Sequence, residues 1–115
     1  MNEYLQYDGL GLAQLVKNKQ ISAQELLEIA ILRTEQVNPK LNAVTIPMYD
    51  EARRYIKAHA NCGEHGAFAG VPFLLKDLFQ EYSGAPASHG SALLKNKNYI
   101  PDFNAEIVNR WQATG

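Results

Sequence analysis

The first apolar pattern along the chain is that of a short amphipathic helix. Within residues 9–18, Leu12, Leu15 and Val16 recur at the three- and four-residue spacing that gathers side chains on one helical face. Lys17 lies near the carboxyl end of this stretch, where a cation interacts favourably with the helix dipole. The pattern predicts a helix that buries one face.

A longer helix is predicted to follow. Ser22 and, three residues later, Glu25 form a capping box, and Ile21 precedes them as the staple residue. The apolar positions after the cap cover more than one narrow stripe, so we expect this helix to pack on two sides. These positions are Leu26, Leu27, Ile29, Ala30, Ile31 and Leu32. The helix is expected to end at Asn38–Pro39, because the residue before a proline disfavours helical geometry.

Two segments are strand candidates, and two others are predicted loops. Residues 41–47 form a short strand candidate that stops at Pro47, and residues 71–78 have the composition of a buried strand. Residues 60–70 and 83–91 are rich in glycine and other small residues, which is typical of loops.

Two further helices are predicted from spacing. The first repeats apolar and aromatic residues on one face and places charged residues on the other. The inward face consists of Ala52, Tyr55, Ile56 and His59. The second helix spans residues 102–115, with Ile107, Val108 and Trp111 directed inward and Gly115 at its carboxyl cap.

The order of these elements indicates an α/β fold that is incomplete. A sheet normally has four to six strands, and two strands cannot cover the apolar helix faces described above. The sequence also stops at a predicted helix cap, where an α/β fold would next form a strand. We therefore expect residues 1–115 to form a single incomplete domain, the front part of a larger one.

Composition and charge narrow the class of protein. The 115 residues are 46% hydrophobic and 20% charged, which is typical of a globular chain that buries a core. The net charge is -1 and basic residues do not cluster with aromatic ones, so nucleic acid is not an expected partner. No signal peptide or membrane-spanning run is recognisable, and Cys62 is the single cysteine. We expect a cytoplasmic protein with no membrane partner.

The segment GVPFLLKDL, residues 70–78, raises a chemical question. Lys76 follows the apolar run 71–75, and a lysine is rarely buried without a partner because its ammonium group is costly to desolvate. Taken alone, such a lysine is more often a strand-end residue whose ammonium group reaches water. The alternative is that the fold keeps it inside for a chemical purpose.

Four stretches resemble the N-terminal part of the amidase signature family. They are GLGLAQLVKNKQISAQELLEIAILRTEQVNPKLNAVTI, AGVPFLLKDLF, GAPASHGSALL and PDFNAEIVNRWQATG. The resemblance covers nearly the whole chain in the right order, and the NPKLNAV turn together with the GVPFLLKD strand is its most specific part. It is strongest toward small-molecule amidases and cyclic-dimer hydrolases, and weaker toward the amidotransferase subunit that works on tRNA.

The resemblance implies that Lys76 is a catalytic base. The family hydrolyses carbon–nitrogen bonds of non-peptide amides with a nucleophilic serine, a bridging serine in a cis peptide linkage and a lysine. A lysine accepts a proton only when it is neutral, and desolvation favours the neutral form. We therefore expect Lys76 to be held out of water, and strand alternation predicts that Asp77 points to the opposite face and does not pair with it.

The serines of the family mechanism have no counterpart in this sequence. Ser22 is explained as a helix cap, whereas Ser83, Ser88 and Ser91 fall in the loop that the family uses near its active site. The SHGS sequence places His89 between Ser88 and Ser91, yet neighbouring residues cannot form a catalytic triad unaided, and a structural role is favoured. The candidates for substrate contacts are Ser88, His89, Gly90 and Ser91.

No cofactor or metal is expected. The three histidines, His59, His65 and His89, are spaced too widely for a common zinc motif. Cys62 lies beside a glycine with no cationic cluster in the neighbouring sequence, so we interpret it as unreactive.

Two functions stay open at this point. The first is an amidase acting on a small-molecule amide, to which this chain contributes only Lys76 and is inactive alone. It could then be a truncated product, the result of a frame shift, or one piece of a split enzyme completed by a C-terminal chain. The second is a non-catalytic module that oligomerises by exchange or binds a partner, because unpaired strand edges favour association. A helical adaptor is a third reading, which the segment 71–78 argues against.

Overall fold

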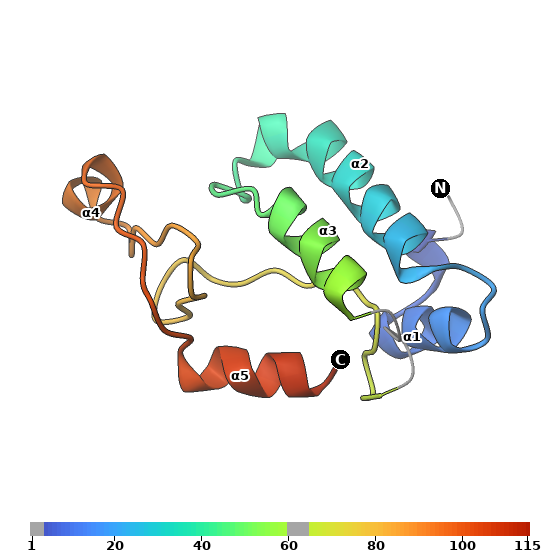
Figure 1. Cartoon of the computed structure of the whole chain (residues 1–115). Coiled ribbons are helices and arrows are strands. Elements are labelled where there is room, and N and C mark those ends of the chain that lie inside the picture. Colours follow the sequence, from blue (N-terminus) through green and yellow to red (C-terminus); the bar gives the residue numbers. More distant parts are fainter. Residues whose placement is uncertain (1–3, 60–64) are drawn as a thin grey trace. The chain divides into compact units, whose positions relative to one another are not determined.

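The computed structural model describes residues 4–59 and 65–115 (Figure 1). Its helices, in chain order, are η1 (Tyr4–Gln6), α1 (Gly9–Lys17), α2 (Ala23–Leu41), α3 (Tyr49–Ala58), α4 (Ala92–Asn96) and α5 (Glu106–Ala113). The chain divides into two compact units, Met1–Pro72 with Thr114–Gly115, and Phe73–Ala113. None of the helices in the described residues combines the length and apolar character needed to cross a bilayer.

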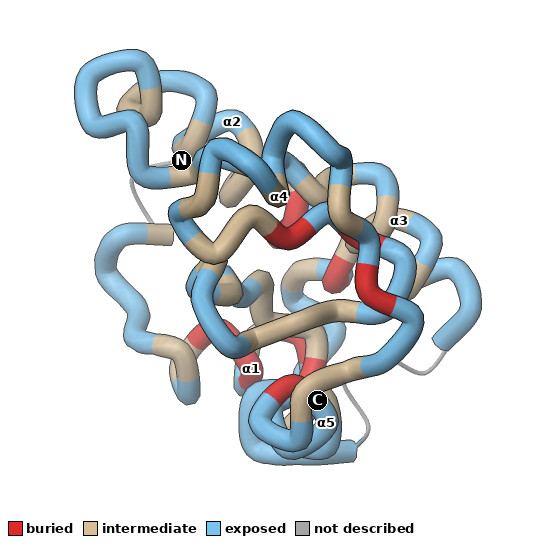
Figure 2. Tube along the Cα trace, turned by 90° about the vertical axis from the view of Figure 1, so that its left-hand side faces the viewer, coloured by how far each residue is buried: buried red, intermediate tan, exposed pale blue. Residues whose placement is uncertain are grey.

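The core of the first unit lies where α1 meets the start of α2. Leu12 and Val16 of α1 pack with Ala23 and Leu26 of α2, and Leu26 is only 1% exposed. Several half-buried residues pack against this cluster, and these are Tyr4, Leu15, Ile21, Ile56 and Val71. The buried stretches of the chain can be followed in Figure 2. The predicted apolar face of the first helix is thus confirmed.

The amino terminus of α2 confirms the predicted capping box. The Ser22 hydroxyl accepts a hydrogen bond from the Glu25 backbone N–H at 3.1 Å, and the Glu25 carboxylate accepts one from the Ser22 N–H at 2.9 Å. Both hydrogen bonds satisfy backbone donors that the helix itself leaves unpaired. The start of α2 is therefore fixed by two residues three positions apart, which is why the sequence predicts it.

The carboxyl end of α2 lies beyond the predicted stop. Pro39 is inside the helix, which continues to Leu41 and ends at Asn42 in the left-handed conformation, with φ of 49°. The Asn42 N–H donates to the Asn38 carbonyl at 2.7 Å and closes the last turn. A proline in the interior of a helix removes one backbone donor and crowds the preceding turn. Here the remaining hydrogen bonds of the final turn are sufficient to keep the helix intact past Pro39.

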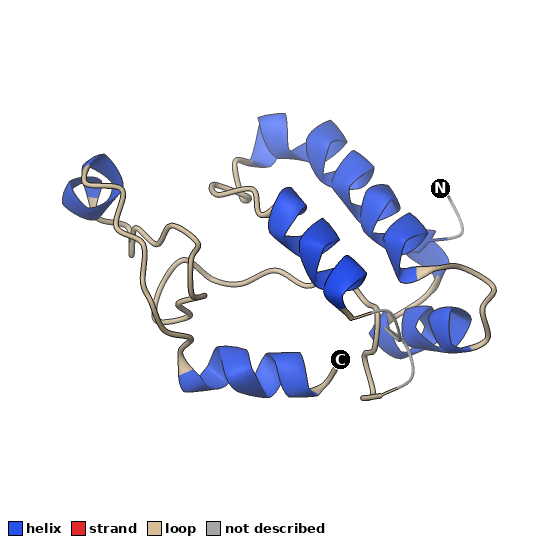
Figure 3. Cartoon of the chain, in the orientation of Figure 1, coloured by secondary structure: helices blue, strands red, loops and turns tan. Residues whose placement is uncertain are grey.

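Neither predicted strand forms in the described residues, where helices and loops alone occur (Figure 3). In the segment 41–47, the Asn38 side chain accepts from the N–H groups of Ala43 and Val44 and donates to the Val44 carbonyl. These bonds replace those of a partner strand. The segment 71–78 is irregular, because no second strand in the described chain pairs with it. The sheet of the expected α/β class is therefore not observed.

Helix α3 runs back alongside α2 and is linked to it by side chains. The Arg53 guanidinium donates to both carboxylate oxygens of Glu28 at 2.8 Å, and Tyr49 donates to Glu35 at 2.6 Å. The charged residues of α3 thus contribute to its packing instead of facing water alone. Leu32, on the other hand, is 50% exposed, so α2 does not pack on two sides along its whole length as predicted.

The second unit is held together by hydrogen bonds between its loops. The N–H groups of Gly84, Ala87 and Ala105 donate to the carbonyls of Pro101, Tyr99 and Glu81 at 2.9 to 3.0 Å. Its buried side chains are small, apart from Val108 of α5, which is 1% exposed. The loop predicted over residues 83–91 is confirmed, and the short helix α4 that follows was not predicted.

Helix α5 buries less of its surface than its sequence predicts. Val108 is buried, but Ile107 and Trp111 are each 40% exposed, so the expectation that all three point inward is wrong. The Trp111 ring lies 4.9 Å from the Phe73 ring, which is itself largely exposed. Beyond the helix, Gly115 has a φ of +100°, and a Cβ added there would lie 2.5 Å from the Ala69 Cα. This close approach requires glycine.

Candidate functional site

Lys76 lies on an exposed, irregular segment of the second unit. Its backbone N–H donates to the Gln80 side-chain oxygen at 2.8 Å, and no ion pair joins it to a described residue. Phe73 and Leu74, which precede it, are 61% and 69% exposed. Lys76 is therefore exposed in the structure described, and the expectation that a complete enzyme holds it out of water stays a prediction. The physical reason is that no layer of this unit covers the apolar run.

Asp77 forms the densest set of hydrogen bonds near Lys76. One carboxylate oxygen accepts from the Ser88 and His89 backbone N–H groups at 2.8 and 3.3 Å, and the other accepts from the Ser88 hydroxyl. Burial acts to raise the pKa of Asp77, but the hydrogen bonds from Ser88 and His89 outweigh it and keep the pKa below its ordinary value. Asp77 thus joins the segment that carries Lys76 to the loop 83–91.

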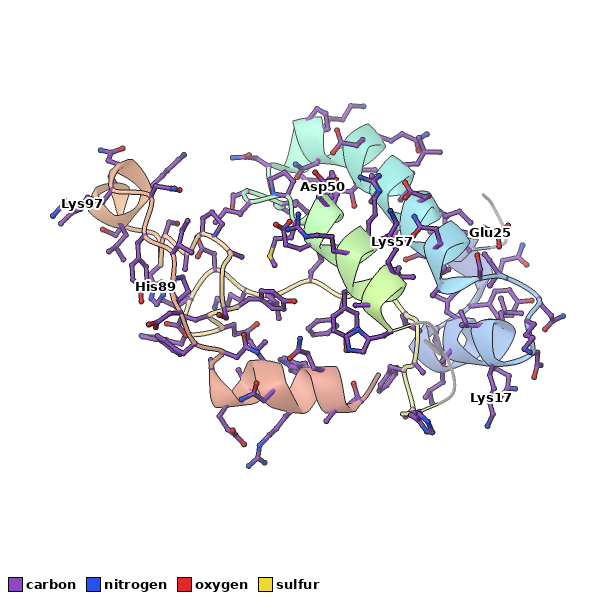
Figure 4. All side chains as sticks on the ribbon, in the orientation of Figure 1. Lys17, Glu25, Asp50, Lys57, His89 and Lys97 are labelled. Atoms are coloured by element: carbon purple, nitrogen blue, oxygen red, sulfur yellow. The ribbon has the colours of Figure 1, made fainter. Side chains whose placement is uncertain are left out.

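His89 fixes the same loop through its side chain. Its Nε2 lies 3.0 Å from a Glu81 carboxylate oxygen, and both side chains are largely buried, at 19% and 12% exposed. The ring also contacts the edges of Phe79 and Tyr99, with centroids 5.6 and 6.5 Å away. Figure 4 shows His89 among the loops of the second unit. His89 therefore closes a compact cluster of polar and aromatic side chains.

The hydroxyl groups of Ser88 and Ser91 have structural partners. Ser88 donates to Asp77, and Ser91 caps α4 by accepting from the Leu94 N–H at 3.5 Å. The His89 imidazole pairs with Glu81 and makes no hydrogen bond to either serine hydroxyl in the described structure. Ser88 and His89 are thus brought together with Asp77 in an arrangement that differs from a serine–histidine nucleophile pair.

The remaining predicted residues lie apart from this cluster. His59 is the carboxyl cap of α3, stacks on Tyr55 at 4.0 Å and is exposed, and His65 is an exposed loop residue. Gly90 lies in an exposed turn with φ of 72°. Cys62 lies outside the described residues. Among the residues that are described, no three metal-binding side chains gather closely enough to hold an ion.

Sequence reasoning missed the contribution of Asp77, Gln80 and Glu81. The sequence predicts only that Asp77 does not pair with Lys76, and it gives no role to Gln80 or Glu81. Asp77 and Ser88 are eleven positions apart, and neither helical nor strand spacing links them. Their contact depends on the turn through Phe79, whose φ is 57° in a region that bulky residues rarely adopt.

Comparisons with known proteins agree on one family. The family model described as Amidase matches residues 25–115. The 6-aminohexanoate-cyclic-dimer hydrolase of Paenarthrobacter ureafaciens is 39% identical over 108 residues, which are 94% of this chain and 21% of that protein. The lipoamidase of Enterococcus faecalis is 37% identical over 95 residues, covering 83% of this chain and 13% of that protein.

A solved structure shows the same fold. The structure of a 6-aminohexanoate cyclic dimer hydrolase superposes with a TM-score of 0.85 and 38% sequence identity, over 95% of this chain and 22% of that one. The chain spans about a fifth of the length of the cyclic-dimer hydrolases that it matches. The family match extends over most of the 115 residues and includes the segment that carries Lys76. The chain belongs to the Amidase family.

Proposed function

We propose that this chain forms the N-terminal part of an amidase that hydrolyses carbon–nitrogen bonds of small linear or cyclic amides. The observation that carries the proposal is the match of fold and sequence to a cyclic-dimer hydrolase over 95% of the chain, at 38% identity. A cyclic dimer of an amino acid is the substrate class that this likeness favours. The cytoplasmic location expected from the sequence is part of the same proposal.

Lys76 is the base of the proposed reaction. Its neutral amine takes the proton of a serine hydroxyl while the seryl oxygen bonds to the amide carbon. The proton then passes to the leaving nitrogen as the carbon–nitrogen bond breaks, and water releases the acyl group in a second cycle. The bridging serine in a cis linkage relays the proton. In the proposal, both serines belong to residues outside this chain, and the 115-residue protein is inactive alone.

Two features of the structure are compatible with this role for Lys76. The Asp77 carboxylate, next in sequence, is hydrogen-bonded to Ser88 and His89 and forms no ion pair with Lys76 in the described residues. The exposed apolar surface at Phe73 and Leu74 is also of the kind that a further layer of an enzyme would cover. Such a layer would desolvate the adjacent amine.

The test uses an amidase that contains this chain, made as one polypeptide or by adding a C-terminal chain, with a cyclic amide dimer as substrate. Lys76→Ala should lower kcat by about 10²- to 10⁴-fold, the usual contribution of a general base. Lys76→Arg should be as inactive, because a guanidinium keeps its proton. Lys97→Ala is the matched control, since Lys97 is an exposed lysine of the same unit that projects from the end of α4 (Figure 4).

The outcomes are distinct. Full activity of Lys76→Ala would refute the base assignment, and absence of amide hydrolysis by the assembled protein would refute the amidase proposal. Turnover by the pure 115-residue protein that Lys76→Ala abolishes would refute only the inactivity of the chain alone.

A second candidate function is a non-catalytic module that associates with copies of itself or with a partner. The observation that favours it is the exposure of Phe79 and Leu93, at 71% and 61%, in addition to the exposed pair Phe73 and Leu74. Sedimentation of the 115-residue protein tests it. A concentration-dependent oligomer would support this function, and a monomer at all concentrations would count against self-association.

A further inference from the structure

The segment that carries Lys76 is held at two points on either side of the lysine Cα. On the amino side, the Lys76 N–H donates to the Gln80 side-chain oxygen at 2.8 Å, which closes the turn 76–80. On the carboxyl side, Asp77 accepts three hydrogen bonds from Ser88 and His89. Side chains thus hold the backbone on both sides of this exposed residue.

The turn between these two points is itself constrained. Phe79 has a positive φ of 57°, a conformation that a bulky residue adopts only where its surroundings impose it. The edge contact of its ring with His89, at 5.6 Å, is one such restraint. The strained backbone conformation of Phe79 thus lies between Asp77 and Gln80, within the turn 76–80 that determines how the Lys76 backbone is oriented.

The loop on the other side of the Asp77 contact is also fixed. Ser91 donates its N–H to the Ser88 carbonyl at 2.8 Å, which closes the turn 88–91. His89 has a φ of 52°, and its Nε2 lies 3.0 Å from the largely buried Glu81 carboxylate. The loop that Asp77 binds thus has hydrogen bonds and an ion pair of its own, and the three hydrogen bonds of Asp77 join it to the residue next to Lys76.

We propose that Asp77 and Gln80 are positioning residues for Lys76. Asp77 anchors the peptide of Lys76 to the loop 83–91 through hydrogen bonds, and Gln80 fixes the peptide on the other side. Asp77 acts through these bonds, because its carboxylate is directed to Ser88 and His89 and forms no ion pair with Lys76 in the described residues. This inference rests on the proposed function, in which Lys76 is the base.

The proposal predicts different behaviour for two Asp77 variants. Asp77→Asn keeps one oxygen for the Ser88 and His89 N–H groups, and its amide nitrogen can donate to the Ser88 hydroxyl oxygen. It should retain the anchor and most of kcat. Asp77→Ala removes the anchor and should lower kcat about tenfold or more while KM changes less than about twofold, because misplacing a base affects the chemical step. Gln80→Ala should act in the same direction as Asp77→Ala.

The experiment has two arms. The first measures kcat, KM and the pH profile of the assembled amidase with the cyclic amide dimer, with Asp102→Ala as the control for an exposed acid of the same unit. The second measures amide hydrogen exchange at Ser88 and His89 in the 115-residue protein, which needs no catalytic activity. Asp77→Ala should accelerate exchange at both amides about tenfold or more. In Asp77→Asn the exchange rates should stay close to those of the unmodified protein.

Each outcome either supports or overturns the positioning role of Asp77. Full kcat in Asp77→Ala, while Lys76→Ala is inactive, overturns the positioning role and leaves the proposed function standing. An Asp77→Asn variant as inactive as Asp77→Ala, or one with a shifted pH profile, also overturns it, since the charge would then be what matters. If Lys76→Ala is fully active, the assignment of Lys76 as the base fails, and the exchange arm still reports whether Asp77 anchors the loop.

Discussion

Replacing Leu26 by alanine tests how the first unit is held together. Leu26 is 1% exposed and packs with Leu12, Val16 and Ala23 at the junction of α1 and α2. Truncating a fully buried leucine costs about 2.7 to 5 kcal/mol, the sum of the lost burial and the cavity left behind. Stability of a domain of this size is on the order of 5 to 15 kcal/mol, so the loss is a large part of the total.

Leu32→Ala is the matched control on the same helix. Leu32 is 50% exposed, so its truncation removes only part of a contact and opens no closed cavity. We expect a cost of about 1 kcal/mol or less, because about half of the burial energy of a leucine is involved and alanine is the better helix former. The two variants have the same change in helix propensity, so their difference of about 2 kcal/mol reports packing alone.

Hydrogen exchange of the α2 amides is the suitable assay, because it measures the opening of that helix without requiring the whole chain to unfold in one step. Leu26→Ala should accelerate the slowest α2 amides at least about 30-fold more than Leu32→Ala, the factor that about 2 kcal/mol represents. Equal acceleration by the two variants would refute the reasoning. It would show that α2 packs on both sides, as its apolar pattern alone predicts.

Two further predictions concern local hydrogen bonds. Ser22→Ala should destabilise the start of α2 by about 1 kcal/mol, and Ser22→Asp should restore most of it, as measured by exchange at the Glu25 amide. The pKa of Asp77 is lowered from its ordinary value of 3.8, so the charge-assisted part of its hydrogen bonds to Ser88 is fully present above about pH 4 and is lost as the pH falls through the lowered pKa, while the neutral carboxyl keeps weaker hydrogen bonds, as asparagine does. Protection of the Ser88 amide from exchange should decrease over that pH range in the unmodified chain. In Asp77→Asn the protection should not change with pH. A Ser88 amide whose protection is independent of pH in the unmodified chain would contradict the assignment of the Asp77 carboxylate as its partner.

The sequence predicts well where a structure is determined by neighbouring residues. The capping box of Ser22 and Glu25 and the helical face of Leu12 and Val16 each depend on residues three or four positions apart, and both are confirmed. The end of α2 lies beyond the predicted stop, because Pro39 is a weak stop when only the last turn follows it and Asn42 can adopt the left-handed cap. The predicted end is wrong because two local preferences compete, that of Pro39 to end the helix and that of Asn42 to cap it.

Contacts between residues that are far apart in the sequence could not be predicted from it. The segment 71–78 has a strand composition, but a strand exists only where another strand supplies hydrogen bonds, and none in the described residues does so. The contact of Asp77 with Ser88 likewise depends on the turn at Phe79, for which the sequence offers no signal. An apolar pattern therefore predicts that a surface needs cover, without identifying what covers it.

The exposure of Lys76 follows from the same argument and gives the proposed mechanism a physical condition. Phe73 and Leu74, two and three residues before it, are exposed, and in the proposed amidase a covering layer over this segment would bury them and desolvate the amine together. Burial of the apolar pair would be favourable by about 25 cal/mol per Å², which can offset the cost of desolvating the lysine. In the proposed amidase, completing the fold and producing a neutral base are thus a single event, while Asp77 and Gln80 hold the lysine backbone in place beforehand.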